Sequence, residues 1–324
     1  MRKNGRSFII RLKRLPWLVK HWACSIRPMH FPEPPASMSS ISEPAPDPMS
    51  REATGTVTAW FAGLTNFSSA EYRWVGERLV ARDTADQPEP ARRGGLSELI
   101  VRHVYADHNS SRAVRQALAP LLADLDRDGA RKGLNFGCGT MEFHDRIINL
   151  DVQNTETVDI VSDGGRIPLK DASVDLIITQ EVLEHIGDYR SALSELERVL
   201  KPGGRIYCQL PFQIGFHPGP YDFYRFSRHG ITELFDGPAW SINQVGISVG
   251  HGTALYRIAV EFFAVTASAI HQTLYKPAKG LTAILLYPLK WFDGLGERSA
   301  ERDRIAGGYF VVATRTHLPE AQKG

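Results

Sequence analysis

The sequence predicts an α/β fold built on a mostly parallel β-sheet, and three observations lead to this prediction. Short apolar runs recur through the middle of the chain, a glycine turn follows the first of them, and a segment with helical spacing precedes the last. Strands that alternate with helices at this spacing are typical of parallel sheets. We therefore expect helices to cover a buried sheet.

The central strands are expected in five short apolar runs, at residues 134–136, 147–151, 158–163, 174–179 and 205–210. Before the last run, apolar residues recur at helical spacing and predict a helix over residues 191–200. The sequence Lys201-Pro202-Gly203-Gly204 would end this helix before the next strand.

The turn after the first strand contains Gly137 and Gly139, which let the backbone turn sharply and approach a ligand closely. Asp151 ends the next strand, where its carboxylate can accept both hydroxyl hydrogens of a ribose. By itself a Gly-x-Gly is just as typical of an ordinary strand-to-helix turn. A nicotinamide-binding fold is disfavoured, because Glu142 stands where its third glycine is expected.

Several motifs occur together in a specific order: Gly137-Cys138-Gly139, Asp151, Asp163, Ile167-Pro168-Leu169, Glu184-His185 and residues 198–204. This series resembles the signature of class I S-adenosylmethionine-dependent methyltransferases, most closely the "type 11" group, over residues 134–235. The resemblance implies a Rossmann-like, seven-stranded sheet with helices on both faces and an antiparallel last strand. Residues 240–249 and 309–314 would supply the last two strands.

The resemblance also implies how S-adenosylmethionine is bound. The backbone of Gly137, Cys138 and Gly139 would face its methionine moiety, and Asp151 would bind its ribose. The remaining cofactor contacts are expected at the adenine, from Asp163 and Gly164, and beneath the sulfonium, from Gln180 and Glu181.

Two departures from the family pattern concern the cofactor site. Asn135 stands where an acidic residue is usual, which would weaken or reroute a contact to the amino group of the cofactor. Residues 141–146 are too few for the helix that most members place after the glycine turn.

Residues 216–227 are expected to form a lid over the methyl acceptor, because loops held by a rigid sheet commonly carry chemistry. His217 or His185 would take a proton from an acceptor hydroxyl, with Asp222 as the orienting partner. The alternatives are that His217 is a hydrogen-bonded loop residue and that His185 caps or packs the following helix. Ser227 is expected to cap a helix over residues 228–234.

Other lid residues are candidates for acceptor binding. Tyr221, Tyr224 and Arg225 would clamp a phosphate or carboxylate of the acceptor. Alternatively, the lid packs on itself and Arg225 pairs with Asp222.

Residues 254–292 contain two strongly apolar helical runs, which predict a helical insertion before the last strand. Arg257, Glu261, His271 and Pro288 interrupt these runs, so no uncharged span of the length that crosses a bilayer is present. We expect the helices to form a lid or to pack against the core. Contact with lipid is the alternative, and would favour a lipid-linked acceptor.

The remaining domain organisation is predicted as follows. Residues 1–55 form a basic, proline- and serine-rich segment, 56–131 a helical cover, 132–316 the methyltransferase domain and 317–324 a tail. Within the cover, helices are expected at 96–105 and 113–125, with a loop at 83–95 between them. The basic residues of 1–30 fit a membrane-surface segment or a transit peptide, unless translation begins at Met38 or Met49.

Composition narrows the function classes. A net charge of +2 gives no reason to expect nucleic-acid binding, and the three cysteines lack metal-ligand spacing, so no metal is expected. The sequence therefore predicts a cytoplasmic methyltransferase acting on an oxygen or nitrogen of a small molecule, glycan or lipid precursor, with peripheral membrane contact left open. The alternative is a non-catalytic module of the same fold that binds partners through its apolar helices.

Overall fold

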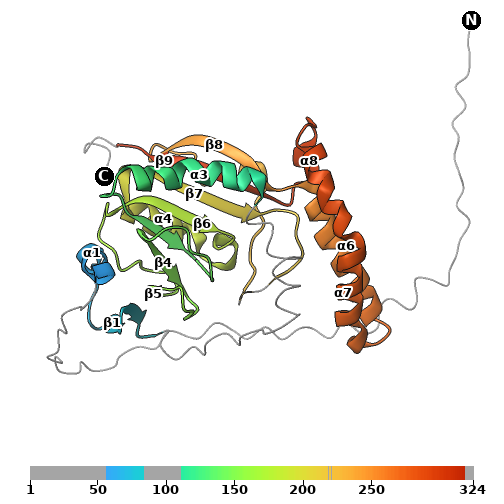
Figure 1. Ribbon diagram of the computed structural model, residues 1–324, viewed down its shortest axis with the longest axis horizontal. Coiled ribbons are helices and arrows are strands. Elements are labelled where there is room, and N and C mark those ends of the chain that lie inside the picture. Colours follow the sequence, from blue (N-terminus) through green and yellow to red (C-terminus); the bar gives the residue numbers. More distant parts are fainter. Residues whose placement is uncertain (1–55, 84–110, 218, 220, 318–324) are drawn as a thin grey trace, which may run out of the picture. The chain divides into compact units, whose positions relative to one another are not determined.

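The computed structural model describes residues 56–83, 111–217, 219 and 221–317 (Figure 1). The basic N-terminal segment, the helix expected at 96–105 and almost all of the expected loop at 83–95 lie outside these residues. So does the tail beyond His317.

Within the described ranges, nine strands form one sheet in the order β1-β2-β5-β4-β3-β6-β7-β9-β8. The strands are β1 (Tyr72–Val75), β2 (Arg78–Ala81), β3 (Gly133–Phe136), β4 (Ile147–Asp151), β5 (Ile160–Val161), β6 (Val174–Gln180), β7 (Leu200–Pro211), β8 (Trp240–Val249) and β9 (Gly308–Arg315). Strands β2, β5, β4, β3, β6 and β7 are mutually parallel. The last strand, β9, is antiparallel to both of its neighbours, β7 and β8, as predicted.

The strand count differs from the expected seven because β1 and β2 form an additional hairpin at the sheet edge. This hairpin replaces part of the cover that we expected to be wholly helical. Tyr72 is buried and Trp74 is half-buried, whereas Arg73 and Val75 are exposed, and this alternation is the pattern of a strand. Gly76, with a φ of +63°, makes the turn between the strands possible.

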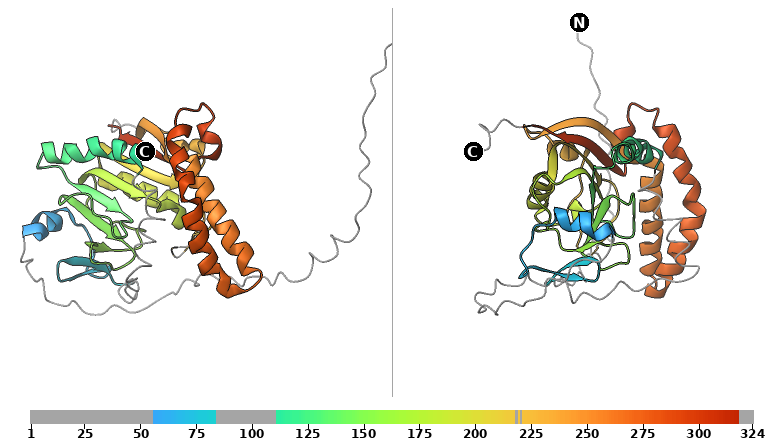
Figure 2. Two further views of the ribbon diagram at one scale, coloured as in Figure 1. Left: turned by 45° about the vertical axis from the view of Figure 1, so that its right-hand side comes forward. Right: turned by 60° about the vertical axis from the view of Figure 1, so that its left-hand side comes forward.

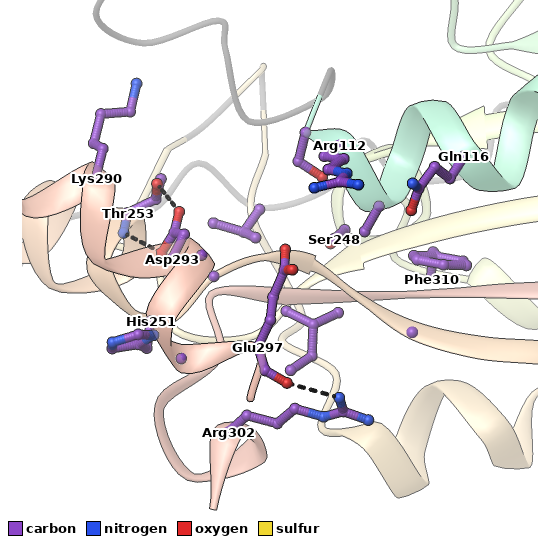
Figure 3. Close-up of a pocket in the computed structure, with 18 of the residues that line it drawn as sticks. Arg112, Gln116, Ser248, His251, Thr253, Lys290, Asp293, Glu297, Arg302 and Phe310 are labelled. Atoms are coloured by element: carbon purple, nitrogen blue, oxygen red, sulfur yellow. Dashed lines mark hydrogen bonds between the residues drawn. The ribbon is translucent and has the colours of Figure 1, made fainter. Parts of the chain in front are cut away.

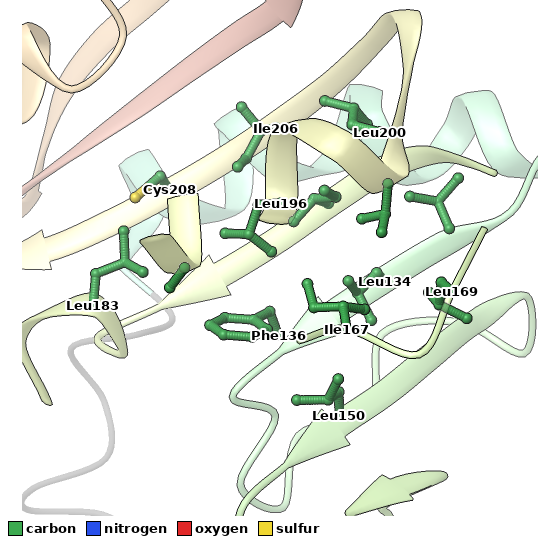
Figure 4. Packing of buried hydrophobic residues seen from close by; sticks show 14 of the residues in the cluster. Leu134, Phe136, Leu150, Ile167, Leu169, Leu183, Leu196, Leu200, Ile206 and Cys208 are labelled. Carbon is green, nitrogen blue, oxygen red and sulfur yellow. The ribbon is translucent and has the colours of Figure 1, made fainter. Parts of the chain in front are cut away.

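Helices cover both faces of the sheet, as predicted. On one face, α4 (Tyr189–Val199) and α5 (Arg228–Glu233) bury Leu196 and Ile231 in a core that includes Leu134 and Phe136. Figure 4 shows Leu196, Leu134 and Phe136 in this core. The helix α1 (Thr56–Leu64) adds to the same core through Phe61. On the other face, α3 (Arg112–Arg127) packs its apolar stripe against β6, β7 and β9.

The helix caps follow the local sequence. Ser227 Oγ accepts a hydrogen bond from Gly230 N at the start of α5, as predicted. Asp188 caps α4 in the same way through Ser191 N. The sequence after α4 was expected to be a plain turn, but β7 begins directly at Leu200. The pairing of β6 and β7 is interrupted over residues 201–204, where Gly203 has a φ of +78°.

The helical insertion lies between β8 and β9 and consists of α6 (His251–Ser268), η3 (Gln272–Leu274), α7 (Tyr275–Leu286), η4 (Tyr287–Phe292), α8 (Asp293–Gly296) and η5 (Arg302–Ile305). The long helices α6 and α7 lie side by side (Figure 2). Tyr256, Val260 and Ala283 are buried between them. Much of their remaining apolar surface is exposed, so they pack mainly on each other and less on the core than expected.

The insertion is anchored at its base by Asp293. Its Oδ1 accepts hydrogen bonds from Gly252 N (2.7 Å) and Thr253 N (3.0 Å), and its Oδ2 accepts one from Thr253 Oγ1 (2.5 Å). In the ranges that the structure covers, no helix has the length and apolar character needed to cross a membrane.

Candidate functional site

The glycine turn lies at the carboxyl end of β3, where open α/β sheets bind their ligands. Gly137 and Gly139 have φ values of +73° and +56°, so both adopt the left-handed conformation that favours glycine. A Cβ at Gly137 would lie 2.2 Å from Val182 Cγ2, because the turn packs directly on the segment after β6. A Cβ at Gly139 would meet no atom within 4 Å, so open space adjoins this part of the turn.

Asp151 holds the turn from the end of β4. Its Oδ2 accepts a 2.7 Å hydrogen bond from Gly139 N, and its Oδ1 accepts one of 2.8 Å from Gln153 N. A carboxylate can accept further hydrogen bonds through the other lone pairs of these oxygens. The structure therefore brings together two of the sequence-predicted cofactor residues, Gly139 and Asp151.

Asp163 follows β5, and its exposed carboxylate accepts a hydrogen bond from Gly165 N (2.9 Å). Gly164 has a φ of +80°, and a Cβ there would lie 2.6 Å from Phe136 Cζ in the end of β3. This close contact places the loop after β5 against the end of β3.

Asn135 is buried and braces the short loop that follows the glycine turn. Its Nδ2 donates to Met141 O (2.9 Å) and to Asn149 Oδ1 (3.1 Å). Residues 137–146 contain no helix, in agreement with the shortened loop that the sequence predicts. The side-chain amide of Asn135 therefore has a clear structural role in this loop.

Gln180 and Glu181 lie at the carboxyl end of β6. Gln180 Nε2 donates to Gln209 Oε1 (3.2 Å), which also accepts from the Tyr207 hydroxyl (2.9 Å). Glu181 has a φ of +56°, an uncommon conformation for a residue with a side chain, and its N–H donates to Gln209 O. This strained turn leads directly into Val182, which contacts Gly137.

In its described residues, the segment that we expected to form a lid is organised around the ion pair of Asp222 and Arg225, which was one of the two alternatives for Arg225. Arg225 Nη2 donates to Asp222 Oδ2 (2.6 Å) and to Gly215 O (3.0 Å). Although burial alone would raise it, the pKa of Asp222 is lowered to about 2, because Arg225 and the N–H of His217 donate to the carboxylate. Arg225 is thus committed to the lid itself.

The other residues of this segment differ in whether their side chains are free to contact an acceptor or are already engaged within the protein. The Tyr224 hydroxyl donates to Gly187 O (2.8 Å), so this side chain also holds the lid in place. Tyr221 is 60% exposed. Asp222 contacts His217 through the backbone N–H at 2.9 Å, whereas its Oδ2 lies 3.6 Å from His217 Nδ1. Asp222 therefore positions His217 mainly through the backbone.

Glu184 is a residue of the site to which the sequence analysis gave no role. Its side chain is completely buried beside His185 and His217. Burial raises the pKa of Glu184, and the neighbouring His217 offsets part of the rise. Burial alone would lower the pKa of His217, but Glu184 and the carbonyl of Gly215 raise it above its usual value. The signal in the sequence was the adjacency of Glu184 and His185.

The two cavities described in the structure lie away from these residues. The larger, of 760 Å³, lies between α3, β8 and the base of the insertion, and its lining includes Gln116, Ser248 and Glu297 (Figure 3). The smaller, of 440 Å³, lies beside Phe61 and Asp159. None of the sequence-predicted site residues lines either cavity.

Comparison with known proteins finds similarity to methyltransferases. Residues 140–208 match the family model described as a methyltransferase domain. A probable S-adenosylmethionine-dependent methyltransferase of Mycolicibacterium smegmatis is 30% identical over 142 residues, covering 41% of this chain and 52% of that protein. A demethylmenaquinone methyltransferase of Bacillus pumilus is 28% identical over 118 residues, covering 35% of this chain and 50% of that protein.

The chain therefore spans about half the length of these curated relatives. Among solved structures, the YcgJ protein of Bacillus subtilis aligns over 63% of this chain and 99% of its own, with 14% identity and a TM-score of 0.39.

Proposed function

We propose that this chain, whose residues 140–208 match the methyltransferase domain family model, transfers a methyl group from S-adenosylmethionine to an oxygen or nitrogen of an acceptor. The observation that carries the proposal is the hydrogen bond between Gly139 N and Asp151 Oδ2, which joins the glycine turn to the acidic end of β4. The open space beside Gly139 fits a ligand at this turn.

The residues that would hold the cofactor come from four strand ends. Gly137, Cys138 and Gly139 would face the methionine moiety, Asp151 the ribose, and Asp163 with Gly164 the adenine. Gln180 and Glu181 would lie beneath the sulfonium. When bound, S-adenosylmethionine supplies a methyl carbon activated by a positively charged sulfur.

The protein's own task is to align the acceptor, exclude water and handle a proton. His217, held by Asp222 and the carbonyl of Gly215, is the candidate base for an acceptor hydroxyl, and His185 lies beside it with ring centroids 5.1 Å apart. Tyr221 remains a candidate for acceptor binding, whereas the contacts of Tyr224 and Arg225 favour a role in holding the lid.

The exposed face of the helical insertion supports a lipid-precursor acceptor. Leu255, Ile258, Phe262 and Val265 form one stripe along α6, at a spacing that keeps them on one side of the helix. Leu281, Ile284 and Leu285 are exposed on α7. Contiguous exposed apolar surface of this kind marks an interaction site.

The lysine side chains of the insertion favour an anionic lipid surface as the partner of this exposed apolar face. Residues 262–292 contain Lys276, Lys279 and Lys290 but no aspartate or glutamate, and Lys279 pairs with Glu261, which directly precedes this range. Trp291, which is 73% exposed, is a residue type that favours the membrane interface. We infer that the insertion rests on the surface of an anionic membrane without spanning it. A second copy of the chain or a protein partner on this face would be the contrary outcome of a binding test.

The competing function is a non-catalytic module of the same fold. Such a module has no need of a glycine turn held by Asp151, nor of a strained Glu181 beside it, so both features favour the enzyme.

The proposal is tested by incubating the full chain with S-adenosylmethionine labelled on its methyl group, together with either a total lipid extract or an aqueous metabolite extract of bacterial cells. We expect label to enter a lipid product with the native protein and not with Asp151→Ala. Label in an aqueous product would retain the enzyme and overturn the lipid acceptor. Absence of label in both extracts, from protein that binds the cofactor, would favour the non-catalytic module.

A further inference from the structure

Three potential metal ligands meet at the end of β6, one from each of Glu184, His185 and His217. His185 Nε2 lies 3.6 Å and His217 Nε2 lies 3.9 Å from the same oxygen, Glu184 Oε1. One ligand atom from each residue lies within 4.8 Å of the others. The first two residues belong to η2 (Leu183–His185), and the third comes from the lid.

Hydrogen bonds at the far side of each imidazole orient these nitrogens. His185 Nδ1 lies 2.5 Å from Tyr221 O, and His217 Nδ1 lies 3.1 Å from Gly215 O. A carbonyl oxygen only accepts, so these contacts place a ring hydrogen on Nδ1, and in the neutral imidazole they leave the lone pair on Nε2. This arrangement is the one by which proteins orient metal-binding histidines.

Arg225 is compatible with this assignment. Its Nη2 lies 3.2 Å from His217 Nδ1, and the contact would require a lone pair on that nitrogen. The same Nη2, however, already donates to Gly215 O and Asp222 Oδ2. It therefore has acceptors without using the imidazole.

The carboxylate of Glu184 is buried, and no group donates a hydrogen bond to it among the described residues. In the described part of the chain, neither of its oxygens has a hydrogen-bond partner, and the same holds for His217 Nε2. Burying an unpaired carboxylate is costly, and buried charges are as a rule paired or bound to metal. Three potential ligand atoms thus lie within 4.8 Å of one another, and a cation bound among them would satisfy all three.

We propose that Glu184, His185 and His217 bind a divalent transition-metal ion of the zinc type. Two imidazole nitrogens and one carboxylate make up a ligand set of catalytic zinc sites, which leave a further position open. Ligands about 2.1 Å from such an ion lie roughly 3.4 Å apart in a tetrahedral site, close to the separations found here. A hard ion such as magnesium would prefer oxygen ligands.

This inference extends the proposed function but does not depend on it. If the chain is a methyltransferase, the open position would take the acceptor oxygen and favour its deprotonated form. A histidine that binds the ion cannot also act as a general base, so the metal and His217 are alternative means of activating the same acceptor.

The test is a calorimetric titration of the full chain, first treated with a chelator, with Zn²⁺, followed by the visible absorption spectrum with Co²⁺. We expect one equivalent of Zn²⁺ to bind and Co²⁺ to give the intense bands of a four- or five-coordinate site. Glu184→Gln and His217→Gln should each weaken binding about 100-fold, by analogy with the upper effect of disturbing metal-site residues. His229→Gln, which changes an exposed histidine, should bind as the native chain does.

The result is informative only for folded variants, which thermal melting and titration with S-adenosylhomocysteine will establish. No binding of Zn²⁺ by the folded native chain would overturn the site and leave an ion pair of His217 with Glu184 as its explanation. Binding that Glu184→Gln leaves unchanged would also overturn it. Since S-adenosylhomocysteine binding is measured separately, failure of the metal site is distinguishable from failure of the methyltransferase proposal.

Discussion

The glycine turn after β3 and the helical insertion after β8 are built in opposite ways. The turn is fixed by backbone geometry and by short hydrogen bonds to neighbouring strand ends, such as that from Gly139 N to Asp151. The insertion holds together through a few buried side chains between α6 and α7, and it leaves large apolar side chains exposed. The difference fits the proposed function, in which the carboxyl ends of the central strands would bind the cofactor and the insertion would meet the environment of the acceptor.

The largest effect on stability is expected from Gly137→Ala. This substitution adds a Cβ where Val182 already lies, at a position where φ is positive. Strain and overpacking together should lower the free energy of unfolding by about 3 kcal/mol or more. Urea denaturation measures this change. An unfolding free energy equal to that of the native chain would mean that the turn does not pack on the β6 loop as described.

Gly139→Ala changes the same turn with a smaller effect on folding, because its Cβ would point into open space. The positive φ should cost only about 1 kcal/mol of stability, so the variant should fold. Its affinity for S-adenosylhomocysteine should nevertheless fall about tenfold or more, since the side-chain methyl group of the new alanine would occupy space next to the cofactor. Unchanged affinity in calorimetry would show that the cofactor lies elsewhere.

The insertion is tested by the double variant Phe262→Ser and Ile284→Ser, whose native side chains are 63% and 67% exposed. Removing two apolar side chains that enter a membrane interface should weaken binding to anionic vesicles about tenfold or more. Flotation with phosphatidylglycerol vesicles measures this, and S-adenosylhomocysteine affinity should be unaffected.

A matched control is Val75→Ser, which removes an exposed apolar side chain on β1. If this control loses vesicle binding as the double variant does, or if the native chain floats equally well with neutral vesicles, the assignment of an anionic membrane to the insertion is wrong.

The smallest effect concerns Cys138 in the glycine turn. Burial raises the pKa of this thiol to about 12, so it should remain protonated and slow to react at pH values where an ordinary cysteine becomes a thiolate. In a Cys24→Ser variant, we expect negligible alkylation by iodoacetamide between pH 7 and 10 in the folded protein, and rapid alkylation in urea. A reaction rate that rises through pH 9 in the folded state would indicate a turn open to water.

The sequence predicted the parallel part of the sheet well, because buried parallel strands are nearly continuous apolar runs. The predicted bounds of β4 and β8 agree with the structure. The hairpin β1 and β2 was missed, since two four-residue strands carry a weak periodic signal beside helical segments. The strand predicted at 158–163 is only two residues long in the structure, β5 at Ile160–Val161.

The sequence predicted those parts of the candidate site that lie on consecutive strand ends. It did not predict the contacts between segments that are distant in the chain. Asp151 and the glycine turn follow from two adjacent strand ends. Glu184 and His217 come from separate segments of the chain, and only the fold brings them together. The sequence analysis judged metal binding from cysteine spacing, which gives no information about a site made of glutamate and histidine. Nor does periodicity reveal which apolar face of a helix is covered, because exposed and buried stripes look alike in sequence.

Asp151 and the glycine turn form the centre of the proposed cofactor site, and calorimetric titration with S-adenosylhomocysteine measures binding there. We expect the native chain to bind one equivalent without any acceptor or membrane, and Asp151→Ala to bind about 10- to 100-fold more weakly, as expected for the loss of charged hydrogen bonds. Asp236→Ala, which removes an exposed carboxylate, should bind as the native chain does. Failure of the folded native chain to bind, or equal binding by Asp151→Ala, would contradict the account.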